Sequence, residues 1–269
     1  MGTRCSCFPV QRWKKKASLK TLGLTLRIDA WLLFALFFPI LVTLVAWSIS
    51  FLWPGVSFSS DVSKLRPFVQ LAQTQPEVAH LATERLQTLG GTWGLLLISV
   101  LAAIAFGPTV NAAIALGEEL GWRGFLFVAW RPLGFWHSSY LIGLVWGLWH
   151  APLIWHGHNY PQHPRIGVVL MMVFTTLWAP FFTLVRERSG SVWHAAVLHG
   201  TLNAIAGISL FTVGGNDLNT GITGLPGILT LLLANFLLWL YQRHSRSATA
   251  LLEKSRNKLR EQDNQDKPH

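Results

Sequence analysis

The chain has 269 residues, of which 13% are charged and 51% hydrophobic, and its mean hydropathy is +0.38. Soluble domains carry about 25% charged residues. The 14 Trp and 16 Phe also exceed what a water-facing surface accommodates. These values exclude a soluble globular protein. Uninterrupted apolar stretches of about 18 residues or more predict an all-α, polytopic transmembrane helical bundle, rather than a β-barrel with short segments of alternating polarity.

The net charge of +10 is concentrated at the two ends of the sequence. Seven Lys or Arg residues precede the first apolar stretch and seven follow the last one. Basic segments beside apolar spans are typical of the cytoplasmic side of a membrane protein, and they do not favour nucleic-acid binding here. We therefore expect an integral protein of the cell (plasma) membrane, with basic cytoplasmic segments at 1–29 and 242–269 around a transmembrane domain at 30–241.

Six apolar spans are expected in chain order: 30–53, 93–130, 138–156, 166–185, 191–211 and 222–241. Six crossings return the chain to its starting side, in agreement with two basic ends. The near-neutral loop 54–91 then faces outward, and the basic turns at Arg131 and 186–188 face the cytoplasm.

The second span is too long for one straight crossing, because its 38 residues would extend about 57 Å as a helix. Gly107-Pro108 is predicted to break it. We expect 108–130 to cross the membrane and 92–107 to be interfacial, re-entrant or strongly kinked. A full crossing by 92–107 would give the alternative of seven spans, with the two basic ends on opposite sides.

Charged side chains inside a span need a partner or a function, because each costs about 2.5 to 3.5 kcal/mol near the bilayer centre. Glu119 and Arg123 are one helical turn apart and can form an ion pair. Glu118 points about 100° away from Glu119 around the helix, so that pair does not satisfy it. Glu118 is therefore a candidate general base. The alternative is that all three residues form a structural packing network.

A second polar group combines imidazole and amide side chains. His199 and Asn203 share one helix face, and His150 lies in another span. They could bind a metal, stabilise an oxyanion, or form only interhelical hydrogen bonds. Glu118, His150 and Asn203 each lie 12 or 13 residues from the expected cytoplasmic end of their span. This spacing corresponds to a common depth of about 18 to 20 Å.

Two further sets of histidines are weaker candidates. His156, His158 and His163 crowd an outward loop with Asn159 and Tyr160, where a cation could bind. Their spacing fits no metal template, so a solvated loop is favoured. His194 lies near a helix start and is expected to be interfacial rather than catalytic.

Three motifs resemble those of the CPBP intramembrane proteases, which comprise the type II CAAX prenyl endopeptidases and the bacterial abortive-infection or bacteriocin-immunity proteins. They are EELGWRGFL from Glu118, WGLWHAP from Trp146, and HGTLN from His199. Each lies in its own span and in the family's order, and the resemblance covers about 108–205. Trp146 stands where the family more often carries Phe.

The resemblance implies that Glu118 activates water with the assistance of His150, and that His199 and Asn203 bind a metal or stabilise the oxyanion. Glu119 and Arg123 would support the site. If zinc is the cofactor, its ligands would be Glu118, His150 and His199, with water in the fourth position. A metal-free mechanism with the same residues is the alternative.

The function expected from this resemblance is an intramembrane endopeptidase. It would cut a membrane-associated peptide or protein in the lipid bilayer, with a cleft opening toward the cytoplasm. A prenylated C-terminus is one substrate that the family name implies. The alternatives are a non-catalytic immunity or binding protein, and an ion-coupled transporter, which the absence of a visible repeat disfavours. The sequence indicates no oligomeric state.

Overall fold

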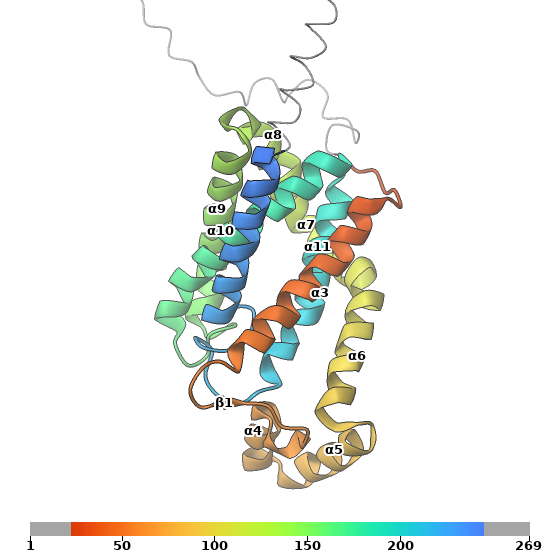
Figure 1. Cartoon of the computed structure of the whole chain (residues 1–269), viewed down its shortest axis with the longest axis vertical. Coiled ribbons are helices and arrows are strands. Elements are labelled where there is room, and N and C mark those ends of the chain that lie inside the picture. Colours follow the sequence, from red (N-terminus) through yellow and green to blue (C-terminus); the bar gives the residue numbers. More distant parts are fainter. Residues whose placement is uncertain (1–22, 245–269) are drawn as a thin grey trace, which may run out of the picture. The chain divides into compact units, whose positions relative to one another are not determined.

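The computed structural model describes residues 23–244, so the cysteines Cys5 and Cys7, most of the basic segment 1–29 and nearly all of 242–269 lie outside the described residues. The described part is almost entirely helical (Figure 1). The main helices are α3 (Ala30–Ser50), α4 (Arg66–Thr74), α5 (Pro76–Thr88), α6 (Gly91–Phe106), α7 (Ala112–Glu119), α8 (Phe127–Trp130), α9 (Phe135–Trp155), α10 (Pro164–Ser189), α11 (Val192–Ile205) and Leu225–His244. Two short strands, β1 (Val56–Ser57) and β2 (Val213–Gly214), pair antiparallel. The all-α membrane bundle expected from composition is thus confirmed.

Chain contacts divide the protein into two compact units, with the boundary between Leu231 and Leu232. In the first unit, successive long helical passes run in alternating directions between two ends (Figure 1). We call the end where α3 begins the proximal end. There the backbone N–H of Val192 donates to the carbonyl of Gly23. The opposite, distal end holds α4, α5, the β1–β2 pair and the α9–α10 loop.

Four described helical segments are long and apolar enough to cross a membrane: Ala30–Ser50, Gly91–Leu133, Pro164–Ser189 and Leu225–His244. They match four of the six expected spans. The other two expected spans contain α9, whose 21 residues include many polar and weakly apolar side chains, and α11, which has only 14 residues. By composition and length, four segments within residues 23–244 qualify as membrane crossings. The long helical passes that alternate in direction also include α9 and α11.

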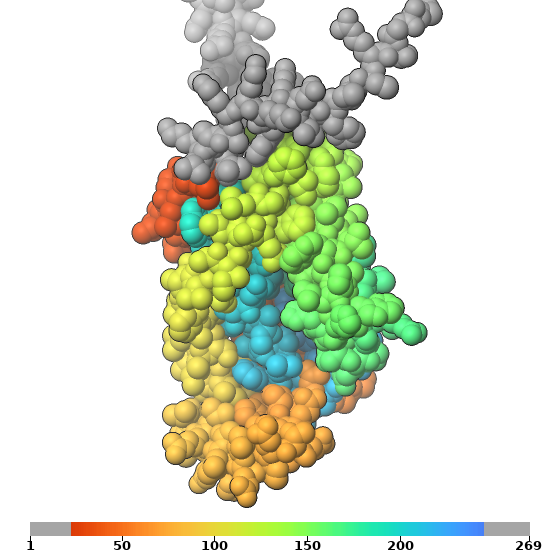
Figure 2. Space-filling model, turned by 180° about the vertical axis from the view of Figure 1, so that it is seen from behind, coloured from red at the N-terminus to blue at the C-terminus, as the bar shows by residue number. Residues whose placement is uncertain are grey.

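The expected break at Gly107-Pro108 is wrong. Instead, the helix continues through a π-helical segment, η2 (Gly107–Asn111), and a second one, η3 (Leu120–Leu126), follows α7. A wider turn accommodates the missing N–H and the ring of Pro108 without ending the helix. The helical run thus covers Gly91–Leu133, and Figure 2 shows it (yellow to yellow-green) turning from one side of the molecule toward the other.

Helix α11 lies at the centre of the first unit, where it packs against α3, α6, α7, α10 and η2. Small residues permit this close packing. A Cβ atom added at Gly200 would lie 2.4 Å from the backbone nitrogen of Ala112, so only glycine fits between α11 and the π-helical turn. Similarly, a Cβ atom at Gly143 of α9 would lie 2.5 Å from the Cα of Thr176 in α10. The helices that carry the polar residues are therefore held at backbone contact distance.

Candidate active site

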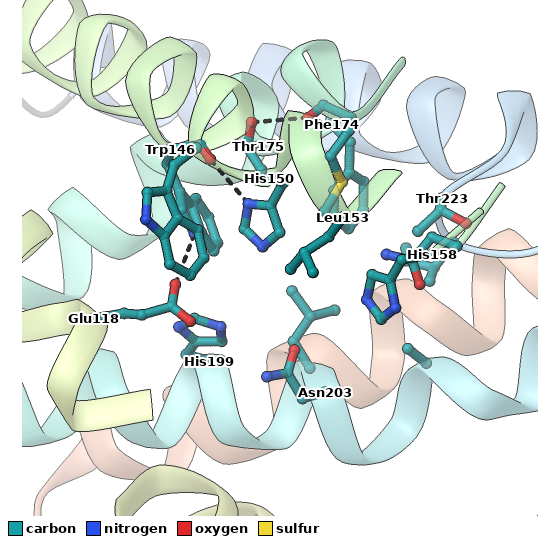
Figure 3. Close-up of a pocket in the computed structure, with 16 residues that line it drawn as sticks. Glu118, Trp146, His150, Leu153, His158, Phe174, Thr175, His199, Asn203 and Thr223 are labelled. Atoms are coloured by element: carbon teal, nitrogen blue, oxygen red, sulfur yellow. Dashed lines mark hydrogen bonds between the residues drawn. The ribbon is translucent and has the colours of Figure 1, made fainter. Parts of the chain in front are cut away.

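A cavity of about 370 Å³ lies among α7, α9, α10 and α11 (Figure 3). Four of the sequence-predicted residues line it together: Glu118, His150, His199 and Asn203. They come from three helices that are far apart in the sequence. The supporting residues Glu119 and Arg123 are not among its lining, because both are fully buried behind it.

The Glu118 carboxylate is held by two tryptophans that the sequence analysis did not assign to it. Its Oε2 accepts a hydrogen bond from Trp146 Nε1 at 3.1 Å and a longer one from Trp122 Nε1 at 3.4 Å. Trp122 reaches it from the π-helical segment η3, and Trp146 from α9. Because both indoles share Oε2, they leave Oε1 free to interact with a group in the cavity.

The His150 imidazole has a defined tautomer. Its Nδ1 lies 2.9 Å from the backbone carbonyl oxygen of Trp146. Because a carbonyl oxygen only accepts, Nδ1 carries the proton and donates. In the neutral ring Nε2 then bears a lone pair, and Figure 3 shows the ring directed into the cavity. His150 can therefore accept a proton or a hydrogen bond from a molecule bound there.

His199 belongs to a buried charge network. Its Nδ1 lies 2.9 Å from Glu119 Oε1, and Arg123 NH1 donates to both carboxylate oxygens of Glu119 at 3.1 and 3.2 Å. The Glu119–Arg123 pair predicted from the helical spacing is thus confirmed. The carboxylate fixes the orientation of the imidazole.

Aromatic rings surround the guanidinium of Arg123. It lies 4.0 Å from the ring centroid of Phe182 and 5.0 Å from that of Trp146. Its Nε and NH2 have no hydrogen-bond partner among the described residues, so cation–π contacts replace hydrogen bonds on those sides. Trp146 therefore connects the two glutamates. Its indole N–H donates to Glu118, and its ring contacts Arg123, the ion-pair partner of Glu119.

Asn203 lies one helical turn beyond His199 on α11 and is exposed to the cavity. No hydrogen bond from residues 23–244 occupies its side-chain amide. Figure 3 shows it on the same side as His199, facing His150 across the cavity. An amide held in this way is available to donate to a ligand oxygen.

The remaining histidines do not join this site as a cluster. His163 Nδ1 pairs with Asp217 Oδ1 at 2.5 Å, and Tyr160 donates to the carbonyl of Thr223 at 2.7 Å. These bonds fasten the α9–α10 loop to the loop before Leu225, so the loop is tethered rather than simply solvated. His158 and Asn159 line the distal part of the cavity. His194, at the proximal end, binds Asp29, the N-cap residue of α3.

The described residues do not supply a metal site. Nowhere in 23–244 do three His, Cys, Asp or Glu side chains lie close enough together to hold a metal ion. Of the three expected zinc ligands, His199 contacts Glu119 through Nδ1, and Glu118 accepts from the indoles through Oε2. The chemistry proposed below uses the protein groups alone.

The lining of the cavity extends from Glu118 to His158, Asn159 and Thr223. Figure 2 shows a hollow between the segments coloured yellow and green, with α11 visible at its base.

Comparison with known proteins gives two matches. Residues 88–205 match the family model described as type II CAAX prenyl endopeptidase Rce1-like. A relative named CAAX prenyl protease 2, from Methanococcus maripaludis, is 30% identical over 88 aligned positions, covering 24% of this chain and 32% of the relative. The match thus spans about a third of that relative's length. No solved structure matches. The resemblance inferred from the three motifs is confirmed for this segment.

Proposed function

We propose that this chain, whose residues 88–205 carry the Rce1-like pattern, is an intramembrane endopeptidase of the cell membrane. Its substrate would be a membrane-associated peptide or protein within the lipid bilayer. One observation carries the proposal: a carboxylate oxygen, an imidazole lone pair and an unoccupied amide line the same cavity at Glu118, His150 and Asn203. Peptide hydrolysis needs a base for water and a donor for the oxyanion, and this set provides both.

In this mechanism a water molecule binds between Glu118 Oε1 and His150 Nε2. Glu118 removes one proton as the water oxygen attacks the scissile carbonyl, and His150 accepts the hydrogen bond of the other proton. The indole donors stabilise the Glu118 carboxylate before the reaction. Once protonated, Glu118 delivers the proton to the departing amine nitrogen, so the same carboxyl group serves as base and then as acid.

The oxyanion that forms on the carbonyl oxygen needs donors on the opposite side of the cavity. Asn203 supplies an amide N–H. His199 would add an Nε2–H donor only as an imidazolium, because its Nδ1 proton is directed at the Glu119 carboxylate. Arg123 already neutralises that carboxylate, so we assign the oxyanion chiefly to Asn203.

Substitution of the base tests the proposal. Glu118→Gln keeps an oxygen acceptor for the indoles but cannot take a proton, so we expect cleavage to fall about 10²- to 10⁴-fold with no change in folded yield. The measurement is mass spectrometry of a panel of membrane-anchored peptides, prenylated and unmodified, incubated with purified protein. Glu84→Gln, on the distal helix α5, is the matched control.

Two further readouts separate the alternatives. Elemental analysis of the same preparation measures bound zinc, and a one-to-one ratio that is lost in His199→Ala would overturn the metal-free mechanism. A wild-type protein that cuts no peptide in the panel, and behaves like Glu118→Gln, would instead favour a non-catalytic binding or immunity protein.

A further inference from the structure

Two arginines meet at the proximal end of the first unit. Arg186 lies three residues before Ser189, the end of α10, and Arg131 follows α8 at the start of the 3₁₀-helical segment η4 (Arg131–Leu133). The two guanidinium groups are close enough for their positive charges to repel each other. Within residues 23–244 neither of them forms an ion pair with a carboxylate. A bound anion would therefore relieve a repulsion that the described residues leave in place.

The Arg186 guanidinium is held in one orientation. Its Nε donates to the backbone carbonyl of Arg123 at 3.0 Å, and its central carbon lies 5.3 Å from the ring centroid of Phe127. The residue is only 8% exposed. No hydrogen bond within the described part of the chain uses NH1 or NH2, and both atoms retain some exposed surface. Two oriented donor groups are thus available to a ligand, which lowers the entropy cost of binding one.

The backbone at Gly23 leaves the end of this guanidinium uncovered. A Cβ atom added at Gly23 would lie 2.8 Å from Arg186 NH2 and 2.6 Å from the carbonyl oxygen of Gly190. The N–H of Val192 holds Gly23 in this place by donating to its carbonyl. Because glycine has no side chain, the chain that leads into α3 passes the cation closely without filling the space beside NH2.

The position of the two arginines along their helices indicates the kind of anion. Both lie within three residues of the end of a helical segment that is long and apolar enough to cross a membrane. These segments are Gly91–Leu133 and Pro164–Ser189. Basic side chains at such ends reach the polar headgroup layer, where tryptophans such as the adjacent Trp130 are also enriched. The anion present at this depth is the phosphate group of a phospholipid, and a guanidinium can bind two of its oxygens at once.

We infer that Arg131 and Arg186 together bind the phosphate group of a phospholipid. Free phosphate offers the same chemistry, so the experiment must separate these two sources. The bound headgroup would also secure η3, because Arg186 holds the carbonyl of Arg123 in that segment. The site lies apart from the residues that line the cavity, and its occupancy does not depend on the proposed peptidase activity.

Titration of the purified full-length protein in detergent with phosphatidylglycerol tests this site. Native mass spectrometry gives the dissociation constant of the first bound lipid. We expect Arg131→Gln to weaken binding about fivefold, as for the loss of one basic residue near a lipid surface. Arg131 is exposed, so this variant should fold normally. Arg186→Lys keeps the charge but loses the planar fork, and a similar loss is expected.

Arg188→Gln is the matched control, because it removes the same charge from the same turn. Arg188 lies about 200° around α10 from Arg186, since successive residues of an α-helix are about 100° apart. It faces the ring of Trp31, whose centroid is 6.0 Å away. We expect its lipid affinity to stay within about twofold of the wild type. Equal losses in Arg131→Gln and Arg188→Gln would mean that the whole basic face attracts lipid through its summed charge, and would overturn the site.

Inorganic phosphate separates the two sources of the anion. Phosphatidylglycerol should raise the unfolding temperature of the wild type more than that of Arg131→Gln, because a ligand stabilises the state that binds it. Millimolar sodium phosphate, compared with sodium chloride at equal ionic strength, should leave both unchanged. A rise with inorganic phosphate that Arg131→Gln removes would overturn the lipid assignment in favour of a soluble phosphate group. No rise with either probe would overturn the site itself.

Discussion

The two adjacent glutamates of the site have opposite surroundings. Glu119 has no exposed surface and accepts hydrogen bonds from Arg123 and His199, so all its neighbours are charged or chargeable. Glu118 is half-buried, receives only neutral indole donors, and borders the cavity. One residue of separation on a helix thus divides a closed, ion-paired region from an open, reactive one. From this difference we expect Glu119 to contribute to folding stability, and we propose Glu118 as the residue that contributes to the chemistry.

The largest expected effect is a loss of folding stability, and it follows from a change in the ion pair of Glu119 and Arg123. Arg123→Leu would leave the Glu119 carboxylate buried without its main counterion, and we expect a loss of about 3 to 5 kcal/mol of folding free energy. Thermal unfolding of the purified protein in detergent measures this change. The double variant Glu119→Leu/Arg123→Leu should recover most of the loss, because it removes both charges. A stable single variant would contradict the network's structural role.

In the open region, loss of the amide donor should reduce activity and not stability. Asn203→Ala removes a proposed oxyanion donor, and we expect kcat to fall about 10²- to 10³-fold. Because the Asn203 side chain is exposed, the unfolding temperature of the Asn203→Ala variant should match that of the wild type. Steady-state cleavage of a membrane-anchored peptide gives kcat. A rise in KM with unchanged kcat would instead assign Asn203 to substrate binding.

Removal of an indole donor to Glu118 should lower kcat by less than removal of the Asn203 amide. Trp146→Phe keeps an aromatic ring beside Arg123 but removes the 3.1 Å hydrogen bond to Glu118, and we expect a cost of about 1 kcal/mol, or roughly fivefold in kcat. Trp122→Phe removes the longer bond and serves as the comparison, with a smaller loss expected. Equal effects, or none, would mean that the indoles do not orient the carboxylate.

The smallest expected effect is on the pH dependence of folding stability. It concerns Asp29, which lies outside the membrane at the start of α3. Partial desolvation opposes ionisation of Asp29, but hydrogen bonds from the backbone N–H groups of Leu32 and Trp31 and from His194 outweigh it and lower its pKa. The stability that Asp29 contributes is therefore present above its unfolded pKa of about 3.9 and is lost as pH falls through the lower folded value.

Asp29→Asn keeps a good N-cap and removes only the titrating charge. Its unfolding temperature should lie slightly below that of the wild type at pH 6, and the two should converge as the pH approaches 3. Differential scanning between these pH values provides the measurement. A constant difference across the range would exclude a contribution from the Asp29 charge.

Part of the site could be predicted from the sequence because helical spacing is regular. The Glu119–Arg123 pair follows from four-residue spacing alone, and equal depth in three spans anticipated that Glu118, His150 and Asn203 would line one cavity. The bond from His199 to Glu119 was not foreseeable. It depends on how α11 packs against α7, and that packing depends on a glycine contact rather than on a polar pattern.

The expectation about helix continuity failed for a different reason. Gly107-Pro108 was expected to end a helix by the usual rule for proline, but a π-helical turn packed against α11 absorbs it. The aromatic residues around Arg123 were not predictable from the sequence either. Phe182 in particular comes from α10, outside the three motifs, and no local spacing indicates its position.

The π-helical segment Leu120–Leu126 has a consequence for how this sequence tolerates change in length. A π-turn holds about one residue more than an α-turn, and it follows directly after both glutamates. Deletion of a single residue there would restore ordinary α-helical winding and rotate Trp122 and Arg123 relative to the carboxylates. The segment should therefore accept substitutions at its exposed positions but no deletion.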